Sequence, residues 1–142
     1  MRKLVIEKSA VKNNLAVIKE RAAGAVIYGV LSGDGGGAGI AALAQLLRDE
    51  GIGHFAVSEV SEAQALREAG FVDEEILMLR STTDREELER LVDLNAVCTI
   101  SSVDTGMALN ALAENLSLIH ISLSCPAPTA GSPSCPWTGG WR

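Results

Sequence analysis

An apolar segment passes into a glycine-rich loop within the stretch Tyr28-Gly-Val-Leu-Ser32-Gly-Asp-Gly-Gly36-Gly-Ala-Gly39. Five glycines fall among residues 33–39, and an amphipathic segment begins at Ile40. A strand, a glycine-rich connection and a helix in this order are typical of an α/β fold. The loop therefore marks a strand–loop–helix unit, and the segments on either side of it indicate which α/β fold it belongs to.

Residues 1–114, the body of the chain, alternate between apolar runs and amphipathic runs. The predicted strands are Ala25–Leu31, His54–Ser58, Glu75–Leu79 and Ala96–Ile100. The predicted helices are a leading one between Ser9 and Gly24, followed by Ile40–Asp49, Glu59–Ala69, Arg85–Val92 and Val103–Ala113. Four βα units after a leading helix predict a parallel sheet with helices on its faces. The continuous apolar run at residues 25–31 is typical of a strand that is covered on both faces.

Local signals place the helix starts and the inward faces of the helices. Ser9 and Ser102 are expected as N-caps, and the pairs Ser61 with Gln64 and Thr83 with Glu86 fit capping boxes. The expected inward residues are Val11, Leu15, Ile18 and Ala22 in the first helix, Leu43, Leu46 and Leu47 in the second, and Leu88, Leu91 and Val92 in the fourth.

Two closures of such a sheet are open: a doubly wound sheet, or part of a (β/α)8 barrel. A full barrel needs about 250 residues, so the body supplies roughly half of one. The strand at residues 96–100 would then have an unpaired edge, where Leu116–Ile121 is a candidate for a fifth strand. The fold class is thus α/β, with about four βα units.

The glycine-rich loop has several chemical interpretations. Gly33, Gly35 and Ala38 satisfy the pattern G-x-G-x-x-A of a dinucleotide-binding loop, and Glu59 follows where a ribose-binding acid would lie. Against this, Ser32 separates the first glycine from the strand. A P-loop fails because no Gly-Lys-Ser/Thr follows. The simplest alternative is that the glycines only permit a tight connection with positive φ.

Composition excludes several classes of protein. The chain has 142 residues, 47% of them hydrophobic and 21% charged, which is ordinary for a globular domain. A net charge of −6 disfavours nucleic-acid binding by phosphate neutralisation. No apolar run approaches the ~20 residues that span a bilayer, and the amino terminus turns charged too early for a signal peptide. We therefore expect no membrane partner, no nucleic-acid partner and a cytoplasmic location.

The last part of the chain, residues 115–142, has a different composition from the body. All 18 acidic residues lie at or before Glu114, and all 4 prolines lie after it. Three interpretations are open: a disordered extension, a small disulfide loop through Cys125 and Cys135, or a coding artefact. Leu116-Ser-Leu-Ile-His-Ile-Ser122 is similar to translated sequencing-adapter DNA, which favours the artefact. We expect a tail unrelated to the body.

The remaining chemistry-bearing residues suggest structural roles. His54 begins a strand, at the end where barrels carry stability rather than catalysis. Cys98 lies within an apolar strand and is expected to be a small buried hydrophobe. His120 belongs to the tail and has no neighbouring ligand set. The cysteines and histidines show no metal-ligand spacing, so no metal site is predicted.

Four segments resemble one known family. The family pattern Val-x-Lys-x-Asx-x-Tyr-Gly-x-Gly is matched in spacing by Val30, Ser32, Asp34, Gly36, Gly37 and Gly39. Val5-Ile-Glu7 with Val11-Lys-Asn-Asn-Leu15, then residues 54–70, then Glu75-Ile-Leu-Met-Leu79, follow in the family's order. Over residues 2–114 the chain resembles the amino-terminal part of alanine racemase, which implies the first half of a (β/α)8 barrel.

The resemblance implies an activity, a cofactor and an assembly. Alanine racemases interconvert L- and D-alanine for peptidoglycan synthesis, use pyridoxal 5′-phosphate held by a lysine, and work as homodimers with a second, mostly β domain. The acid/base groups are the cofactor lysine and a tyrosine of the partner subunit. The resemblance therefore implies an amino-acid substrate, this cofactor and a homodimer.

Two informative positions depart from the family. Ser32 stands at the position of the cofactor lysine, and Gly36 stands at the position of the tyrosine that contacts the cofactor phosphate. A hydroxyl cannot replace an amine in a Schiff base. We expect an inactive, truncated racemase-like chain. The alternatives are an NAD(P)-binding Rossmann-like domain and a non-catalytic binding protein derived from a racemase.

Overall fold

The sheet of the computed structural model, which describes residues 4–116 and 121–122, is entirely parallel. Its strands are β1 (Gly29–Val30), β2 (His54–Val57), β3 (Glu75–Met78), β4 (Val97–Thr99) and β5 (Ile121–Ser122). The helices are α1 (Lys8–Ala22), α2 (Ser32–Gly36), α3 (Ile40–Asp49), α4 (Val60–Glu68), α5 (Arg85–Asp93) and α6 (Val103–Leu116). Each predicted βα unit of the body is therefore present.

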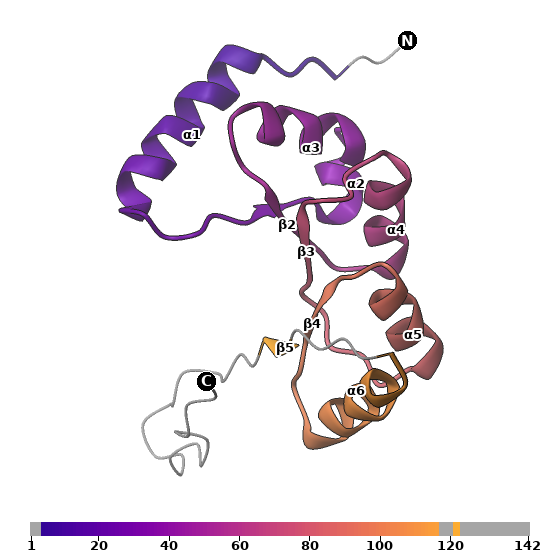
Figure 1. Cartoon of the computed structure of the whole chain (residues 1–142). Coiled ribbons are helices and arrows are strands. Elements are labelled where there is room, and N and C mark those ends of the chain that lie inside the picture. The colour runs from indigo at the N-terminus through magenta and orange to yellow at the C-terminus, as the bar shows by residue number, and fades with distance from the viewer. Residues whose placement is uncertain (1–3, 117–120, 123–142) are drawn as a thin grey trace.

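The strands lie in the order of the chain, β1-β2-β3-β4-β5. A parallel crossover is almost always right-handed, so consecutive crossovers place successive helices on the same face of the sheet. Figure 1 shows α3, α4, α5 and α6 following one another along one side, with α1 beyond β1. Because the order never reverses, these strands lack the switch point of a doubly wound sheet. The half-barrel prediction is confirmed.

The core lies between the sheet and these helices. Leu31, Phe55, Val57, Ile76, Met78, Cys98 and Ile100 are the buried residues of the strand segments on that side. Phe55 meets Phe71 edge to face at 5.6 Å between ring centroids, and burial of aromatic pairs contributes strongly to a core of this size. Cys98 is buried, as predicted, and burial raises its thiol pKa.

The opposite face of the sheet is uncovered at its β1 edge, although Ala56 of β2, which pairs with Val30 on that face, is buried. In β1, Val30 is 61% exposed, whereas the adjacent Leu31 is fully buried. The run at residues 25–31 is therefore not a strand covered on both faces, and the strand itself is only two residues long. That prediction was wrong because all crossovers turn the same way, which leaves one face without helices among the described residues.

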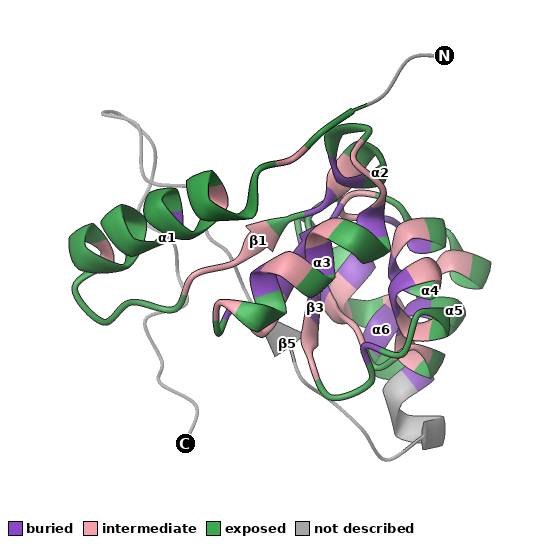
Figure 2. Ribbon diagram, turned by 90° about the horizontal axis from the view of Figure 1, so that it is seen from above, coloured by how far each residue is buried: buried purple, intermediate pink, exposed green. Residues whose placement is uncertain are grey.

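Helix α1 is loosely attached. Of its predicted inward residues Leu15 is buried and Val11 and Ala22 are partly buried, but Ile18 is 47% exposed. Figure 2 shows α1 largely exposed, in contrast to the buried residues gathered around α3 and the strands. Lys19 Nζ donates a hydrogen bond to the backbone carbonyl of Glu50, which ties α1 to the connection between α3 and β2.

Helix bounds agree with the prediction more closely than helix caps do. For α1 the N-cap is Glu7 and not Ser9, whose hydroxyl bonds the Glu7 carboxylate. The capping box of α4 uses Glu59 and Glu62 in place of Ser61 and Gln64, and α5 is capped by Asp84 in place of Thr83. In α4 and α5 a carboxylate accepts hydrogen bonds from backbone N–H groups at the helix start, whereas the Glu7 side chain makes no capping bond to α1. Ser102 accepts from Thr105 N at 3.3 Å, as expected for α6.

The apolar faces follow the periodicity, with one shift. In α5, Leu88 and Leu91 are buried as predicted. In α3 the buried residues are Ile40, Ala44 and Leu47, while the predicted Leu43 and Leu46 are only partly buried. Within the described residues, none of the helices has both the length and the hydropathy needed to cross a membrane.

The position of the fifth strand differs from the prediction. A fifth strand pairs with β4, but it is Ile121–Ser122, whereas α6 extends through Leu116. His120 and the two cysteines of the predicted tail lie outside the described residues. The separate origin of residues 115–142 stays a prediction.

Candidate functional site

The carboxyl ends of β1–β4 lie at one edge of the sheet, because the strands are parallel. We call this edge the carboxyl-terminal rim, made of residues 32–39, 58–59, 79–84 and 100–102. The edge that holds the amino ends of the strands is the amino-terminal rim. Functional groups of βα folds gather at the carboxyl ends of strands. Ser32 and Gly36, the two predicted site positions, both lie on this rim.

The glycine-rich loop is a left-handed turn. Gly33, Asp34, Gly35 and Gly36 have φ of 67°, 54°, 65° and 68°. A side chain with a Cβ is disfavoured in this region by about 1–2 kcal/mol per residue, and Asp is among the residues that tolerate it best. The turn therefore explains the glycines by backbone conformation alone, which was the simplest alternative at the sequence level.

Ser32 lies two residues after the end of β1, at the start of α2, and its hydroxyl faces the residue that follows the next strand. Its Oγ lies 2.7 Å from Ser58 Oγ, which follows β2. The two hydroxyls satisfy one another across the rim. Neither member of this pair is an amine, and a hydroxyl cannot form a Schiff base.

Gly36 ends the turn in open space. A Cβ built at this position meets no atom within 4 Å, yet its φ of +68° is strained for any L side chain. The left-handed backbone at residue 36 therefore favours glycine over a tyrosine, which has a Cβ and an aromatic ring.

Asp34 turns back to cap the following helix. Its Oδ1 accepts a hydrogen bond from Ile40 N, the first residue of α3, at 2.8 Å. A carboxylate at a helix N-terminus is stabilised by the exposed N–H groups and the helix dipole. The Asp34 carboxylate of the glycine-rich loop therefore occupies the N-terminus of α3.

Glu62, on α4, ties two loops of the rim together. Its Oε1 accepts from Gly33 N at 2.6 Å and Asp34 N at 3.4 Å, and its Oε2 accepts from Ser58 N at 3.0 Å and Glu59 N at 3.1 Å. Burial raises the pKa of this carboxyl, but the four backbone N–H groups outweigh it and the pKa is lowered. The carboxylate is thus the form that holds the loops.

Arg80 follows β3 and joins the β2 and β3 sides of the rim. Its guanidinium forms a bidentate pair with Glu87 at 2.8 and 3.2 Å, contacts Glu59 Oε2 at 3.3 Å, and donates to the Ser58 carbonyl at 3.3 Å. The hydrogen bond with Arg80 lowers the pKa of the Glu87 carboxyl and raises the pKa of Arg80 itself. Both acids therefore neutralise this cation.

At the amino-terminal rim the side chain that makes most of the backbone contacts is a cation, Arg67. Arg67, also on α4, donates to the carbonyls of Phe71, Val72, Glu74, Leu94 and Asn95 at 2.6 to 3.3 Å. At the same edge Tyr28 donates to the carboxylate of Glu75, and its ring lies 5.3 Å from that of His54, edge to face. The structural role expected for His54 is consistent with this placement.

Sequence reasoning missed the charged residues that organise both rims. Glu62 lies three residues after Glu59, a capping-box spacing, but the pattern was assigned to serine and glutamine two residues later. Glu59 was weighed as a ribose-binding acid, whereas it pairs with Arg80. Arg67 gave no local signal, because its partners follow it in the chain and are backbone carbonyls.

Comparison with known proteins identifies the family. The family described as "Alanine racemase, N-terminal domain" matches residues 6–125. The chain belongs to the alanine racemase family. An alanine racemase of Levilactobacillus brevis is 31% identical over 109 residues, which is 76% of this chain and 29% of that protein. The chain thus spans under a third of the length of this racemase.

Solved structures agree in fold. Alanine racemase from Clostridium difficile 630 superposes with a TM-score of 0.69 at 30% identity, covering 75% of this chain and 28% of that one. A histidine racemase from Leuconostoc mesenteroides gives a TM-score of 0.71 at 26% identity, covering 84% and 32%. The α/β class with the first part of a racemase barrel is therefore established for this chain.

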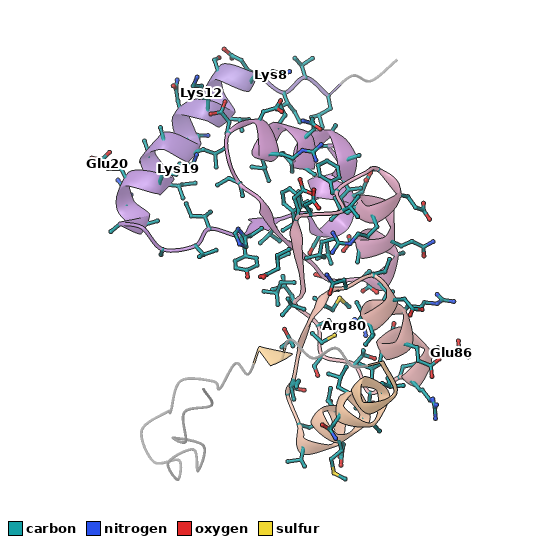
Figure 3. All side chains as sticks on the ribbon, in the orientation of Figure 1. Lys8, Lys12, Lys19, Glu20, Arg80 and Glu86 are labelled. Atoms are coloured by element: carbon teal, nitrogen blue, oxygen red, sulfur yellow. The ribbon has the colours of Figure 1, made fainter. Side chains whose placement is uncertain are left out.

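The described residues of this chain do not fit the cofactor implied by the family, pyridoxal phosphate. All four lysines of the sequence lie between Lys3 and Lys19. Figure 3 shows Lys8, Lys12 and Lys19 along α1, apart from Arg80 at the carboxyl-terminal rim, and Lys19 is bonded to a carbonyl at the amino-terminal rim. Within the described part of the chain, no lysine amine lies at the rim where Ser32 stands.

Proposed function

We propose that this chain is the amino-terminal barrel portion of a racemase-like protein and does not itself catalyse racemisation. One observation carries the proposal: the residue that begins the loop after β1 is Ser32, hydrogen-bonded to Ser58, while every lysine of the sequence lies at or before residue 19. The resemblance that equates Ser32 with the cofactor lysine equates Gly36 with the phosphate-contacting tyrosine.

The chemistry of the rim supports the proposal. A racemase has to remove the Cα proton of an amino acid and return a proton on the other face, which calls for a positioned acid/base group on each face. Ser32 offers a hydroxyl that is hydrogen-bonded to another hydroxyl, that of Ser58. The nearby carboxylates of Glu59 and Glu87 are paired with Arg80, and that of Glu62 is taken up by backbone N–H groups. These groups are structural.

The properties of the whole protein follow the family. The relatives' name, alanine racemase, supports an amino-acid substrate, and a homodimer and a cytoplasmic location are what the resemblance to the family implies. The strand order gives no support to the dinucleotide-binding alternative, and Asp34 already occupies the N-terminus of the helix that such a loop would offer.

Borohydride trapping tests the proposal directly. The purified chain is incubated with pyridoxal phosphate, reduced, digested and mapped, and D-alanine formation from L-alanine is measured in parallel. We expect no D-alanine, and label on the amino-terminal lysines only, at the level seen for the urea-unfolded chain.

Two variants locate the family position. Ser32→Lys is expected to gain label at residue 32 faster than Ser61→Lys gains it at residue 61, an exposed position on α4. Equal labelling of the two would remove the equivalence of Ser32 with the cofactor lysine. Formation of D-alanine by the unmodified chain would overturn the proposal itself.

A further inference from the structure

Four helices, α3 to α6, begin at the carboxyl-terminal rim. The first N–H groups of a helix have no partner within the helix, and together with the helix dipole they make a natural site for phosphate or another anion. Whether this rim receives an anionic ligand therefore depends on what already occupies those N–H groups.

The first two helices are occupied by carboxylates. Asp34 Oδ1 takes the N–H of Ile40 at the start of α3, at 2.8 Å. Glu62 takes the N–H of Glu59 at the start of α4, and also those of Ser58 and Gly33 in the preceding loops. The donors of the glycine-rich loop and of the β2–α4 connection are thus satisfied by this chain.

The next two helices are occupied as well. Asp84 Oδ1 accepts from Glu86 N at 2.9 Å and Glu87 N at 3.3 Å at the start of α5. Ser102 Oγ accepts from Thr105 N at 3.3 Å at the start of α6. At each of the four helix starts on the described rim, a side chain of this chain therefore accepts one or two of the backbone N–H groups that an anion would use.

The charge of the rim adds a second obstacle to an anion. The guanidinium of Arg80 is shared between Glu59 and Glu87, and Arg85 pairs with Glu89 at 2.8 Å. Within the described residues, the carboxylates of Asp34, Glu62 and Asp84 form no ion pair with a lysine or arginine. An incoming phosphate would meet like charge at short range, which is unfavourable.

We infer that the carboxyl-terminal rim of β1–β4 is a closed structural rim that takes no phosphate or other anionic group, because the chain's own side chains hold the donors such a group needs. The inference rests on the proposed function in taking this rim as the family's site. It concerns the phosphate end of the implied cofactor, whereas the proposed function concerns the amine.

Amide hydrogen exchange of the full chain tests the inference, with inorganic phosphate as the probe and chloride at matched ionic strength as its control. Without phosphate we expect slow exchange at Gly33, Ile40, Ser58 and Glu59, and no change when phosphate is added. Faster exchange that slows on adding phosphate, or a melting temperature that rises with phosphate but not with chloride, would overturn the inference.

Two variants assign the donors. Glu62→Ala should speed exchange at Gly33, Ser58 and Glu59 at least tenfold while Ile40 stays slow, and Asp34→Asn should speed Ile40 alone. The matched control is Glu68→Ala, which removes an exposed acid of the same helix that bonds only Gln64. If the variants leave exchange unchanged, the carboxylates are not the occupants and the inference fails.

The outcomes separate the two proposals. A phosphate response without D-alanine formation would overturn this inference and leave the proposed function standing. D-alanine formation without a phosphate response would do the reverse. Should Glu62→Ala not fold, the phosphate measurements on the unmodified chain still decide the matter.

Discussion

Helix α4 carries two side chains of opposite charge that contact the backbone at opposite edges of the sheet. At the carboxyl-terminal rim Glu62 gathers four backbone N–H groups, and at the amino-terminal rim Arg67 gathers five backbone carbonyls. In a βα unit the strand's carboxyl end leads to helix starts, which expose N–H groups, and its amino end follows helix ends, which expose carbonyls. The comparison shows that the side chain organising each rim has the charge that complements the backbone groups exposed there: a carboxylate for N–H groups and a guanidinium for carbonyls.

The largest effect is expected at the amino-terminal rim. Arg67→Ala removes a cation that satisfies carbonyls in two loops, and hydrogen bonds to a charged group contribute more than neutral ones, so we expect a loss of about 3 kcal/mol in unfolding free energy. Urea denaturation measures it. Arg85→Ala, which removes an exposed i,i+4 pair with Glu89, should cost less than about 0.5 kcal/mol. Equal losses of unfolding free energy in the two variants would mean that the hydrogen bonds of Arg67 to the loop carbonyls do not stabilise the fold.

The second effect concerns the acid at the other rim. Glu62→Gln should cost about 2 kcal/mol at pH 7, because an amide replaces a carboxylate that accepts four hydrogen bonds. The folded pKa of Glu62 lies below 4.5, so its contribution is present above pH 4.5 and disappears as the pH falls through the folded pKa. The gap between unmodified chain and variant should therefore narrow on acidification.

Urea denaturation from pH 7 to pH 3 measures this gap. Glu68→Gln, which changes an exposed acid on the same helix, serves as the control and should give a small difference in unfolding free energy at pH 7. A gap that widens toward acid would contradict the assignment of the carboxylate as the holding form.

The third effect sharpens the account of the glycine-rich loop. Gly36→Ala places a Cβ at φ +68° and should cost about 1 kcal/mol, although the surrounding space is open. Gly53→Ala is the matched control, because Gly53 also has open space and lacks a positive φ, and it should change stability by less than about 0.5 kcal/mol. Thermal unfolding compares the two. Similar values would show that the left-handed turn is not required.

The smallest effect is expected for the hydrogen bond between Tyr28 and Glu75 at the amino-terminal rim. The hydrogen bond to Glu75, together with burial, raises the pKa of Tyr28 from 10.0 to about 12. Since the folded pKa is raised, the contact contributes fully below pH 10 and is lost as the pH rises toward 12. Tyr28→Phe should cost about 0.5 kcal/mol at pH 7.

A direct titration checks the Tyr28 contact, because Tyr28 is the sole tyrosine of the sequence. The phenolate absorbance of the folded chain should have its midpoint near pH 12. In the Glu75→Gln variant the midpoint should move back toward 10. A midpoint near 10 in the unmodified chain would show that the contact does not form.

Much of the fold was predictable from local patterns. The bounds of α3 were predicted at Ile40–Asp49, and β2, β3 and β4 each lie within their predicted ranges. Helix caps were less predictable, since serine, threonine and acids compete for the same N–H groups. In α4 and α5 the acids prevailed, because a carboxylate forms the stronger bond to an exposed N–H.

The organising contacts of the rims were not predictable from the sequence. Gly33 and Glu62 are 29 residues apart, and Arg67 and Asn95 are 28 apart. Such partners meet only when parallel strands bring successive loops to the same edge. Periodicity reports which face of an element is buried, but it carries no information about which loop lies beside it.

The sequence by itself determined the order of elements, the family, the glycine requirement of the loop and the absence of lysine beyond residue 19. Each is a property of local chemistry: apolar periodicity, backbone freedom without a Cβ, and the presence or absence of an amine. The tertiary structure alone decided that Ser32 faces Ser58, that Glu62 and Arg67 close opposite rims, and that one face of the sheet stays open. Those outcomes depend on the handedness and register of parallel crossovers, which bring distant groups into contact and which no single segment encodes.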